Sequence, residues 1–142
     1  MTKNPNPSAS EWVLVTGGSH GIGRALALDC IRRNLAVIIV ALPNDDLLHI
    51  KQELSGIEGA VFATFGINLV KEGAINEVMD WLKNENLRPK YLINNAGFGR
   101  VGLSENTSRC EYLPMMQVNK QVMVVLTYEL STLPQDTNAH LH

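Results

Sequence analysis

The sequence has few of the features that mark specialised classes of protein. It contains two cysteines, Cys30 and Cys110, which form no Cys-x-x-Cys pair and are too few for a disulfide framework. Its longest uninterrupted apolar run, Leu35–Leu42, has eight residues, far short of the roughly 20 that cross a bilayer. The four histidines show no metal-ligand spacing. The sequence therefore favours neither a disulfide scaffold, nor a membrane protein, nor a metal site.

Positive and negative charges are spread along the chain, without a block of either sign. Its 142 residues carry 12 Lys+Arg against 14 Asp+Glu, a formal net charge of −2, with no basic block of the kind that marks a nucleic-acid binder. Residues 1–10 are polar and rich in proline, which predicts a disordered tail and neither a signal peptide nor a transit helix. Residues 11–142 then form one domain of ordinary composition. We expect a cytoplasmic protein without a nucleic-acid or membrane partner.

Strand-like and helix-like segments alternate along this domain. Apolar and β-branched runs predict four strands, and apolar residues at helical spacing predict a helix after each strand. The predicted strands are 12–16, 36–41, 60–65 and 91–94, and the predicted helices are 22–33, 45–54, 71–86 and 108–133. Pro114 predicts a kink or a restart in the last helix, because it cannot donate a backbone hydrogen bond. The alternation indicates a doubly wound parallel α/β sheet that stops after its fourth strand and the following helix.

A glycine-rich loop joins the first strand to the first helix. It contains Gly17, which permits a tight turn, Gly21, which lets the backbone approach a pyrophosphate, and Gly23, which lets the helix pack closely on the strand. The start of that helix offers unpaired N–H groups to an anion. Glycines also end strands for steric reasons alone, so this loop by itself leaves a structural role open. The missing Gly-Lys-Ser/Thr ending argues against a mononucleotide P-loop.

A second motif, Asn-Asn-Ala-Gly at residues 94–97, closes the fourth predicted strand. Together with Thr-Gly-x-x-x-Gly-Ile-Gly at residues 16–23, it resembles the short-chain dehydrogenase/reductase family. Asn68-Leu69 stands where this family usually has Asp and an apolar residue after the third strand. Asn119 matches the Asn of the family's catalytic tetrad. The resemblance covers about residues 12–140 and implies a Rossmann-like, NAD(P)-binding domain.

The resemblance implies NAD(H) or NADP(H) as the bound cofactor. The glycine loop would hold the pyrophosphate and the adenosine ribose, the segment after the third strand would contact the adenine, and the second motif would line the nucleoside side. The residues expected at the cofactor are Gly17, Ser19, His20, Gly21, Ile22, Gly23, Asn68, Leu69, Asn95, Ala96 and Gly97. Asn68 lacks the charge of the usual Asp, but its side-chain oxygen can still accept a hydrogen bond.

The end of the second predicted strand bears on the choice between the two cofactors. A carboxylate there normally binds the ribose hydroxyl of NAD, and NADP-selecting relatives often carry an Arg. Ala41-Leu42 provides neither. His20 stands where NADP-preferring relatives often have a basic residue, and we favour NADP(H) on that ground. The alternative is that His20 is an ordinary solvated loop residue.

The family's catalytic Tyr-x-x-x-Lys is missing from these 142 residues. Tyr91, Tyr112 and Tyr128 are followed four positions later by Asn, Met and Thr. Asn119 is then the one catalytic candidate, and without general acid–base catalysis about 10²- to 10⁴-fold of rate is lost. We expect the cofactor-binding part of an oxidoreductase for a small carbonyl or alcohol substrate, which is inactive alone.

Two other functions remain open from the sequence. One function is a non-catalytic nucleotide-binding or subunit-interaction module. The other is an S-adenosylmethionine-dependent methyltransferase, which needs an acidic residue where Ala41-Leu42 stands.

A second copy of the chain is a further expected partner. The fourth predicted strand would present an unpaired apolar edge, and the last helix carries Val118, Val122, Val125 and Leu126. We therefore expect a homo-oligomer that forms through the sheet edge or the last helix.

Overall fold

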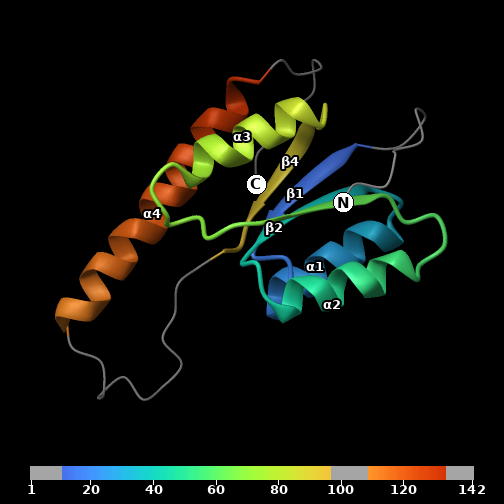
Figure 1. The fold of residues 1–142 in the computed structure, drawn as a ribbon, viewed down its shortest axis with the longest axis horizontal. Helices are drawn as coiled ribbons and strands as arrows, with labels where there is room; N and C mark the ends of the chain where they lie inside the picture. Colours follow the sequence, from blue (N-terminus) through green and yellow to red (C-terminus); the bar gives the residue numbers. More distant parts are fainter. Residues whose placement is uncertain (1–10, 97–108, 134–142) are drawn as a thin grey trace.

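The computed structural model describes residues 11–96 and 109–133, with side chains described for all of them except 109–119. Strands and helices alternate throughout, as predicted (Figure 1). In chain order the elements are β1 (Trp12–Thr16), α1 (Gly21–Arg32), β2 (Ala36–Ala41), α2 (Asp45–Ser55), β3 (Phe62–Gly66), α3 (Ala74–Asn84), β4 (Pro89–Asn94) and α4 (Arg109–Ser131).

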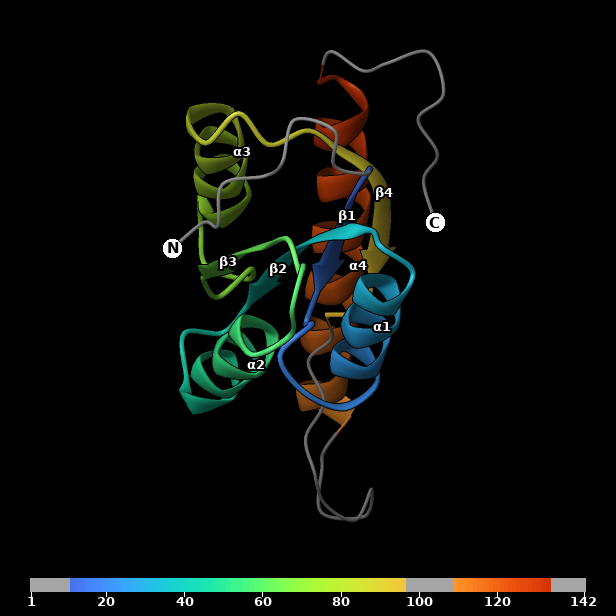
Figure 2. The same cartoon turned by 90° about the vertical axis from the view of Figure 1, so that its right-hand side faces the viewer.

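The four strands form one parallel sheet in the order β3-β2-β1-β4. β1 lies between β2 and β4, with Leu14 opposite Ile38 on one side and Leu92 on the other. The chain leaves β1 toward β2 and β3 and then returns across the sheet to β4 (Figure 2). This arrangement confirms the predicted doubly wound fold, and it places a topological switch point between β1 and β4.

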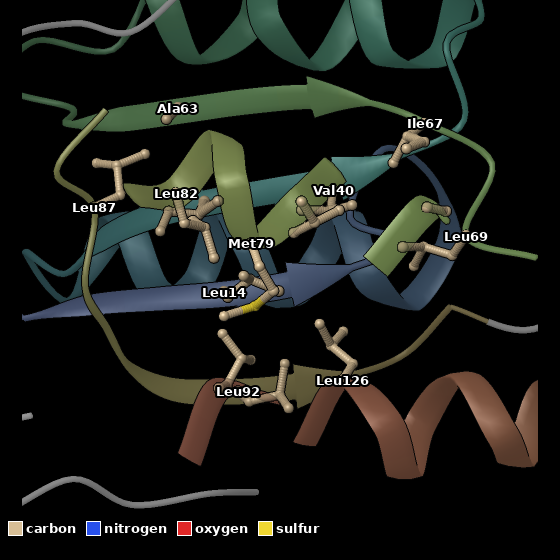
Figure 3. Packing of buried hydrophobic residues seen from close by; sticks show 14 residues of the cluster. Leu14, Val40, Ala63, Ile67, Leu69, Met79, Leu82, Leu87, Leu92 and Leu126 are labelled. Atoms are coloured by element: carbon tan, nitrogen blue, oxygen red, sulfur yellow. The ribbon is translucent and has the colours of Figure 1, made fainter. Parts of the chain in front are cut away.

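Helices cover both faces of the sheet. Leu14 and Val40 point to the face covered by α3 and α4, where they meet Leu82 and Leu126 (Figure 3). Ile38 belongs to the same buried cluster. The alternate strand residues point to the other face and pack on α1 and α2; they include Val13, Val15, Val37 and Ile39. All six residues of β2 are buried, because a strand covered on both faces needs apolar side chains throughout.

Several predicted boundaries differ from the observed ones; for example, β4 begins at Pro89, two residues before the predicted start. β3 begins two residues later than predicted, at Phe62. α3 begins at Ala74, because the Asn68 side chain accepts from the Val70 N–H in a turn and Gly73 takes a left-handed φ of 77°. The sequence predicted a kink or a restart of the last helix at Pro114. α4 is instead one continuous helix through this position, so the prediction of a restart is wrong. Within the described residues, no helix is long and apolar enough to cross a membrane.

Candidate functional site

A cavity of about 350 Å³ opens at the carboxyl ends of the strands, where a doubly wound sheet binds its ligand. The end of β1, the β2–α2 and β3–α3 connections, the end of β4 and α4 all contribute to its wall. The lining residues are Gly17, Ser19, His20, Val40, Ala41, Leu42, Asn44, Ile67, Asn68, Leu69, Val70, Asn95, Ala96 and Val122. The cavity thus collects residues from five parts of the chain at one edge of the sheet.

The glycines of the first loop have different surroundings. Gly17 has a φ of +67°, and a Cβ there would lie 2.9 Å from the Ala96 Cα. Gly23 is buried against the protein's own backbone, because a Cβ would lie 2.1 Å from the Gly17 carbonyl oxygen. Gly21 has a φ of +57° and open space around it. Gly17 and Gly23 therefore let segments of the chain approach one another, whereas Gly21 leaves its surface open to a ligand.

The ends of β1 and β4 are joined by three hydrogen bonds. The backbone N–H groups of Asn95 and Ala96 both donate to the Thr16 hydroxyl, over 3.0 and 2.9 Å. The Asn95 side-chain amide donates to the Gly17 carbonyl oxygen over 3.1 Å. Thr16 is 1% exposed, so water does not replace these bonds. Asn95, predicted from the sequence as a cofactor-lining residue, therefore also fixes the glycine loop against β4.

Helices α1 and α2, which both begin at this edge, differ in how their first turns are satisfied. α2 begins with Asn44, whose side chain accepts from the Leu47 N–H, and its first turn carries Asp45 and Asp46. α1 begins after His20, whose side chain makes no capping hydrogen bond, and its first turn carries no acidic residue. Because free N–H groups and the helix dipole favour anions, the start of α1 is suited to an anionic group from outside the chain.

The part of the cavity toward β3 is mostly apolar. Val40, Ile67 and Leu69 are buried and form part of its wall. Asn68 is exposed, and its side-chain oxygen already accepts from the Val70 N–H over 3.2 Å. That oxygen has a second lone pair, so it can accept one more hydrogen bond. A flat heterocycle with a polar edge matches this combination of surfaces.

A smaller hollow of about 150 Å³ lies on the α4 side of β4. Its lining includes Thr16, Asn94, Ala96 and Lys120. The Asn94 side-chain amide donates to the Thr127 hydroxyl over 3.1 Å, which ties β4 to α4. Asn119 directly precedes Lys120 in α4, and its side chain lies outside the described part of the chain.

Seven of the residues predicted at the cofactor line the main cavity together: Gly17, Ser19, His20, Asn68, Leu69, Asn95 and Ala96. Gly21 and Ile22 lie at the exposed start of α1, where Ile22 is 74% exposed, and Gly23 is buried beneath them. Gly97 lies outside the described residues. Val70 and Val122 were not predicted as lining residues, because the sequence shows neither the β3–α3 turn nor the place of α4.

Asn44 also lines the cavity without having been predicted there. The signal was present, because Asn directly before Asp-Asp and an apolar run is typical of a helix N-cap. A cap on the helix after β2 necessarily lies at the carboxyl edge of the sheet, beside the cavity.

The sequence matches the family model of the short chain dehydrogenases over residues 11–138. The chain belongs to this family. The bovine (Bos taurus) 3-ketodihydrosphingosine reductase is 29% identical over 122 residues, which cover 82% of this chain and 37% of that protein. The chain spans about a third of the length of the curated relatives that it matches.

Solved structures share the fold. The L-sorbose reductase of Gluconobacter frateurii, complexed with NADPH and L-sorbose, matches with a TM-score of 0.72 and 20% identity over 86% of this chain and 46% of that one. A 4-hydroxyisoleucine dehydrogenase complexed with NADH matches with a TM-score of 0.70 and 22% identity over 86% of this chain and 48% of that one. The likeness confirms the Rossmann-like architecture, and the chain corresponds to about half of each structure.

Proposed function

We propose that this chain is the cofactor-binding part of an NAD(P)-dependent oxidoreductase. The observation that carries the proposal is the cavity at the switch point, bordered by Gly17, Ser19 and His20 where α1 begins without a side-chain cap. The first N–H groups of α1 would bind the pyrophosphate, and Asn68 with the apolar wall beside it would hold the adenine. A bound nicotinamide would supply hydride transfer.

Between the two cofactors we propose NADP(H). Ala41 and Leu42, at the end of β2, offer no carboxylate for the ribose hydroxyl of NAD, while His20 lines the cavity. The L-sorbose reductase binds NADPH and the 4-hydroxyisoleucine dehydrogenase binds NADH, so this family fold accommodates both dinucleotides. The chain's own residues are therefore the basis of the proposal.

The substrate we propose is a small carbonyl or alcohol compound, with Asn119 as a catalytic residue of the whole enzyme. The 142 residues contain no Tyr-x-x-x-Lys to act as the general acid and base. We therefore expect this chain to bind the dinucleotide without turning over substrate by itself. A nucleotide-binding module without catalysis is the alternative, and it predicts the same binding.

We also propose that a second copy of the chain binds along α4. Met123, Val124, Val125 and Tyr128 are 43–65% exposed on this helix, and between residues 120 and 131 the charged side chains are Lys120 and Glu129. An apolar solvent-facing surface of this kind marks an interface. The outer edge of β4 lies beside it and has no partner strand in the described part of the chain.

Sedimentation tests this interface. We expect the wild-type chain to sediment as a dimer, and Val124→Glu to shift it toward the monomer because the new carboxylate would be buried without a partner. Gln52→Glu, which adds the same charge to the exposed surface of α2 on the other face of the sheet, is the control. A wild-type chain that is monomeric at all concentrations contradicts the proposed interface.

Calorimetric titration of the chain with NADPH and with NADH tests the proposed cofactor. We expect saturable binding of one dinucleotide per chain, with the higher affinity for NADPH. A folded chain that binds neither dinucleotide contradicts the proposed function, and a chain that prefers NADH contradicts the choice of cofactor. An assay of substrate turnover with the same sample separates a binding part from a complete enzyme.

A further inference from the structure

An ion pair joins the two helices that cover one face of the sheet. The guanidinium of Arg24, in the first turn of α1, contacts the carboxylate of Glu53, in the last turn of α2. Their side chains are 43% and 40% exposed. Water competes with an ion pair of this kind, so the pair contributes little to the stability of the chain.

Each of these two charges lies at the unfavourable end of its own helix. The start of a helix carries a partial positive charge and its end a partial negative charge, so a cation in the first turn and an anion in the last turn are both disfavoured. The first turn of α1 has no acidic residue, and the last turn of α2 has no basic one. The cation of Arg24 therefore adds to the positive end of α1, beside the cavity.

Arg24 lies one helical turn from the cavity. His20 lines the cavity and directly precedes the first turn of α1. The backbone N–H of Arg24 donates to the His20 carbonyl oxygen over 3.2 Å. Residues four positions apart lie on the same side of a helix, so the Arg24 side chain begins close to the cavity although it does not line it.

The ion pair turns the Arg24 side chain away from the cavity. α1 follows β1 and α2 follows β2 in a parallel sheet, so both helices begin at the carboxyl edge and run away from it. Glu53, in the last turn of α2, is therefore farther from this edge than Arg24. Side chains of a helix normally lean toward its N-terminus, which for Arg24 is the direction of the cavity. Without Glu53, the guanidinium would lean toward a bound ligand.

From this arrangement we propose that Arg24 is a further residue of the dinucleotide site, and that it exchanges the Glu53 carboxylate for the pyrophosphate when the dinucleotide binds. This inference rests on the proposed function, because it needs a dinucleotide in the cavity. A guanidinium can donate two parallel hydrogen bonds to a phosphate, and such charge-assisted bonds are strong. The exposed ion pair with Glu53 is weak enough to be replaced. Glu53 is then a positioning residue, which holds the guanidinium away from the cavity until the ligand binds.

Calorimetric titrations of Arg24→Gln and Glu53→Gln with NADPH and with NADH test this exchange. We expect Arg24→Gln to lower both affinities about tenfold, because both dinucleotides contain the pyrophosphate and the variant loses a charge-assisted hydrogen bond. Glu53→Gln should raise both affinities about threefold, because the guanidinium no longer has to leave an ion pair, and an exposed pair is weak. The double variant should bind like Arg24→Gln, since Glu53 acts through Arg24 alone.

Asp29→Asn is the matched control. It removes the same charge as Glu53→Gln and breaks a second ion pair of α1, between Asp29 and Arg33 over 2.9 Å, at the end of the helix away from the cavity. We expect this variant to bind both dinucleotides with the wild-type affinities. Urea denaturation of all the variants checks that each is folded.

Two results overturn the exchange while dinucleotide binding itself remains. A Glu53→Gln variant that binds more weakly than the wild type, or as tightly, means that the ion pair holds α1 against α2 or has no role in binding. A gain in affinity from Glu53→Gln that persists in the double variant means that the lost charge acts without Arg24. A folded wild-type chain that binds neither dinucleotide overturns the proposed function and the exchange together.

Discussion

The Cβ position of Gly23 lies 2.1 Å from the carbonyl oxygen of Gly17. That oxygen also accepts a hydrogen bond from the side-chain amide of Asn95. A Cβ placed on Gly23 would lie 2.3 Å from the Nδ2 of this amide. Helix α1 therefore packs backbone against backbone on the turn that leaves β1. This contact holds the start of α1 at the cavity, and with it the N–H groups that we propose bind the pyrophosphate.

Replacing Gly23 by Ala is expected to destabilise the chain and to abolish dinucleotide binding. Neither neighbouring atom can move, because one is backbone and the other is held by a hydrogen bond, so the loss of stability is about 3 kcal/mol, as for other overpacked sites. Gly56→Ala is the control, since its Cβ would lie 3.4 Å from the nearest atom. Urea denaturation measures both variants, and equal midpoints for the two would contradict the packing argument.

Thr16→Val is expected to loosen the junction between β1 and β4. The substitution keeps the shape of the side chain but leaves the N–H groups of Asn95 and Ala96 without their acceptor, which costs about 1–3 kcal/mol. Thr16→Ser keeps the hydroxyl and serves as the control. Stability and NADPH affinity should fall together in the Val variant and stay near the wild-type values in the Ser variant. A Val variant as stable as the Ser variant would rule out this role for Thr16.

Gly21→Ala and Gly59→Ala separate backbone strain from ligand contact. Both glycines have a left-handed φ, +57° and +78°, and neither has another atom close to its Cβ position. Each substitution should therefore cost about 1 kcal/mol of stability. Only Gly21 stands at the start of α1, so only Gly21→Ala should also weaken dinucleotide binding, which calorimetry measures. Equal affinities in the two variants would show that the ligand does not approach Gly21.

Tyr91 gives a prediction for alkaline pH. Its hydroxyl donates to Glu11 Oε2 over 2.8 Å, and this hydrogen bond, with smaller contributions from burial and from the Glu11 charge, raises the pKa of Tyr91. A raised pKa in the folded state stabilises the protein below the ordinary tyrosine value of about 10, and this stabilisation is lost as the pH rises through the folded pKa.

The test is the melting temperature of Tyr91→Phe between neutral pH and pH values above about 10. The variant should melt below the wild type at neutral pH, and the difference should disappear in the alkaline range. Tyr128→Phe removes the hydroxyl of a tyrosine that is 65% exposed and should follow the wild type throughout. A melting-temperature difference between the wild type and Tyr91→Phe that is the same at every pH would contradict a stabilising hydrogen bond from the protonated Tyr91 phenol to Glu11.

The architecture could be predicted from the sequence because its signals are local. The apolar run of β2 and the alternation of strand and helix patterns determine a parallel sheet, and they place the glycine loop and Asn95 at one edge. The limits of α3 could not be predicted in the same way. Its predicted start at Lys71 continues a helical pattern, whereas the left-handed backbone of Gly73 prevents the helix from beginning earlier.

The details of the cavity depend on contacts between distant segments. Val122 reaches the cavity because α4 packs on the sheet through Leu126 and Leu130, and nothing in the local sequence specifies that approach. The Thr16 hydroxyl accepts two N–H groups from residues 79 and 80 positions later in the chain. Such a contact follows from the register of β1 and β4 and not from the residue types alone.

The most direct test of the proposed site is to follow the backbone amide signals of the chain by NMR during a titration with NADPH. We expect the largest shifts at Gly17, Ser19, Asn44 and Ala96, around the cavity at the carboxyl edge of the sheet. Gly59, in the connection from α2 to β3, should stay unchanged. Shifts centred on that connection, or no shifts at saturating NADPH, would contradict a dinucleotide site between the glycine loop and the end of β4.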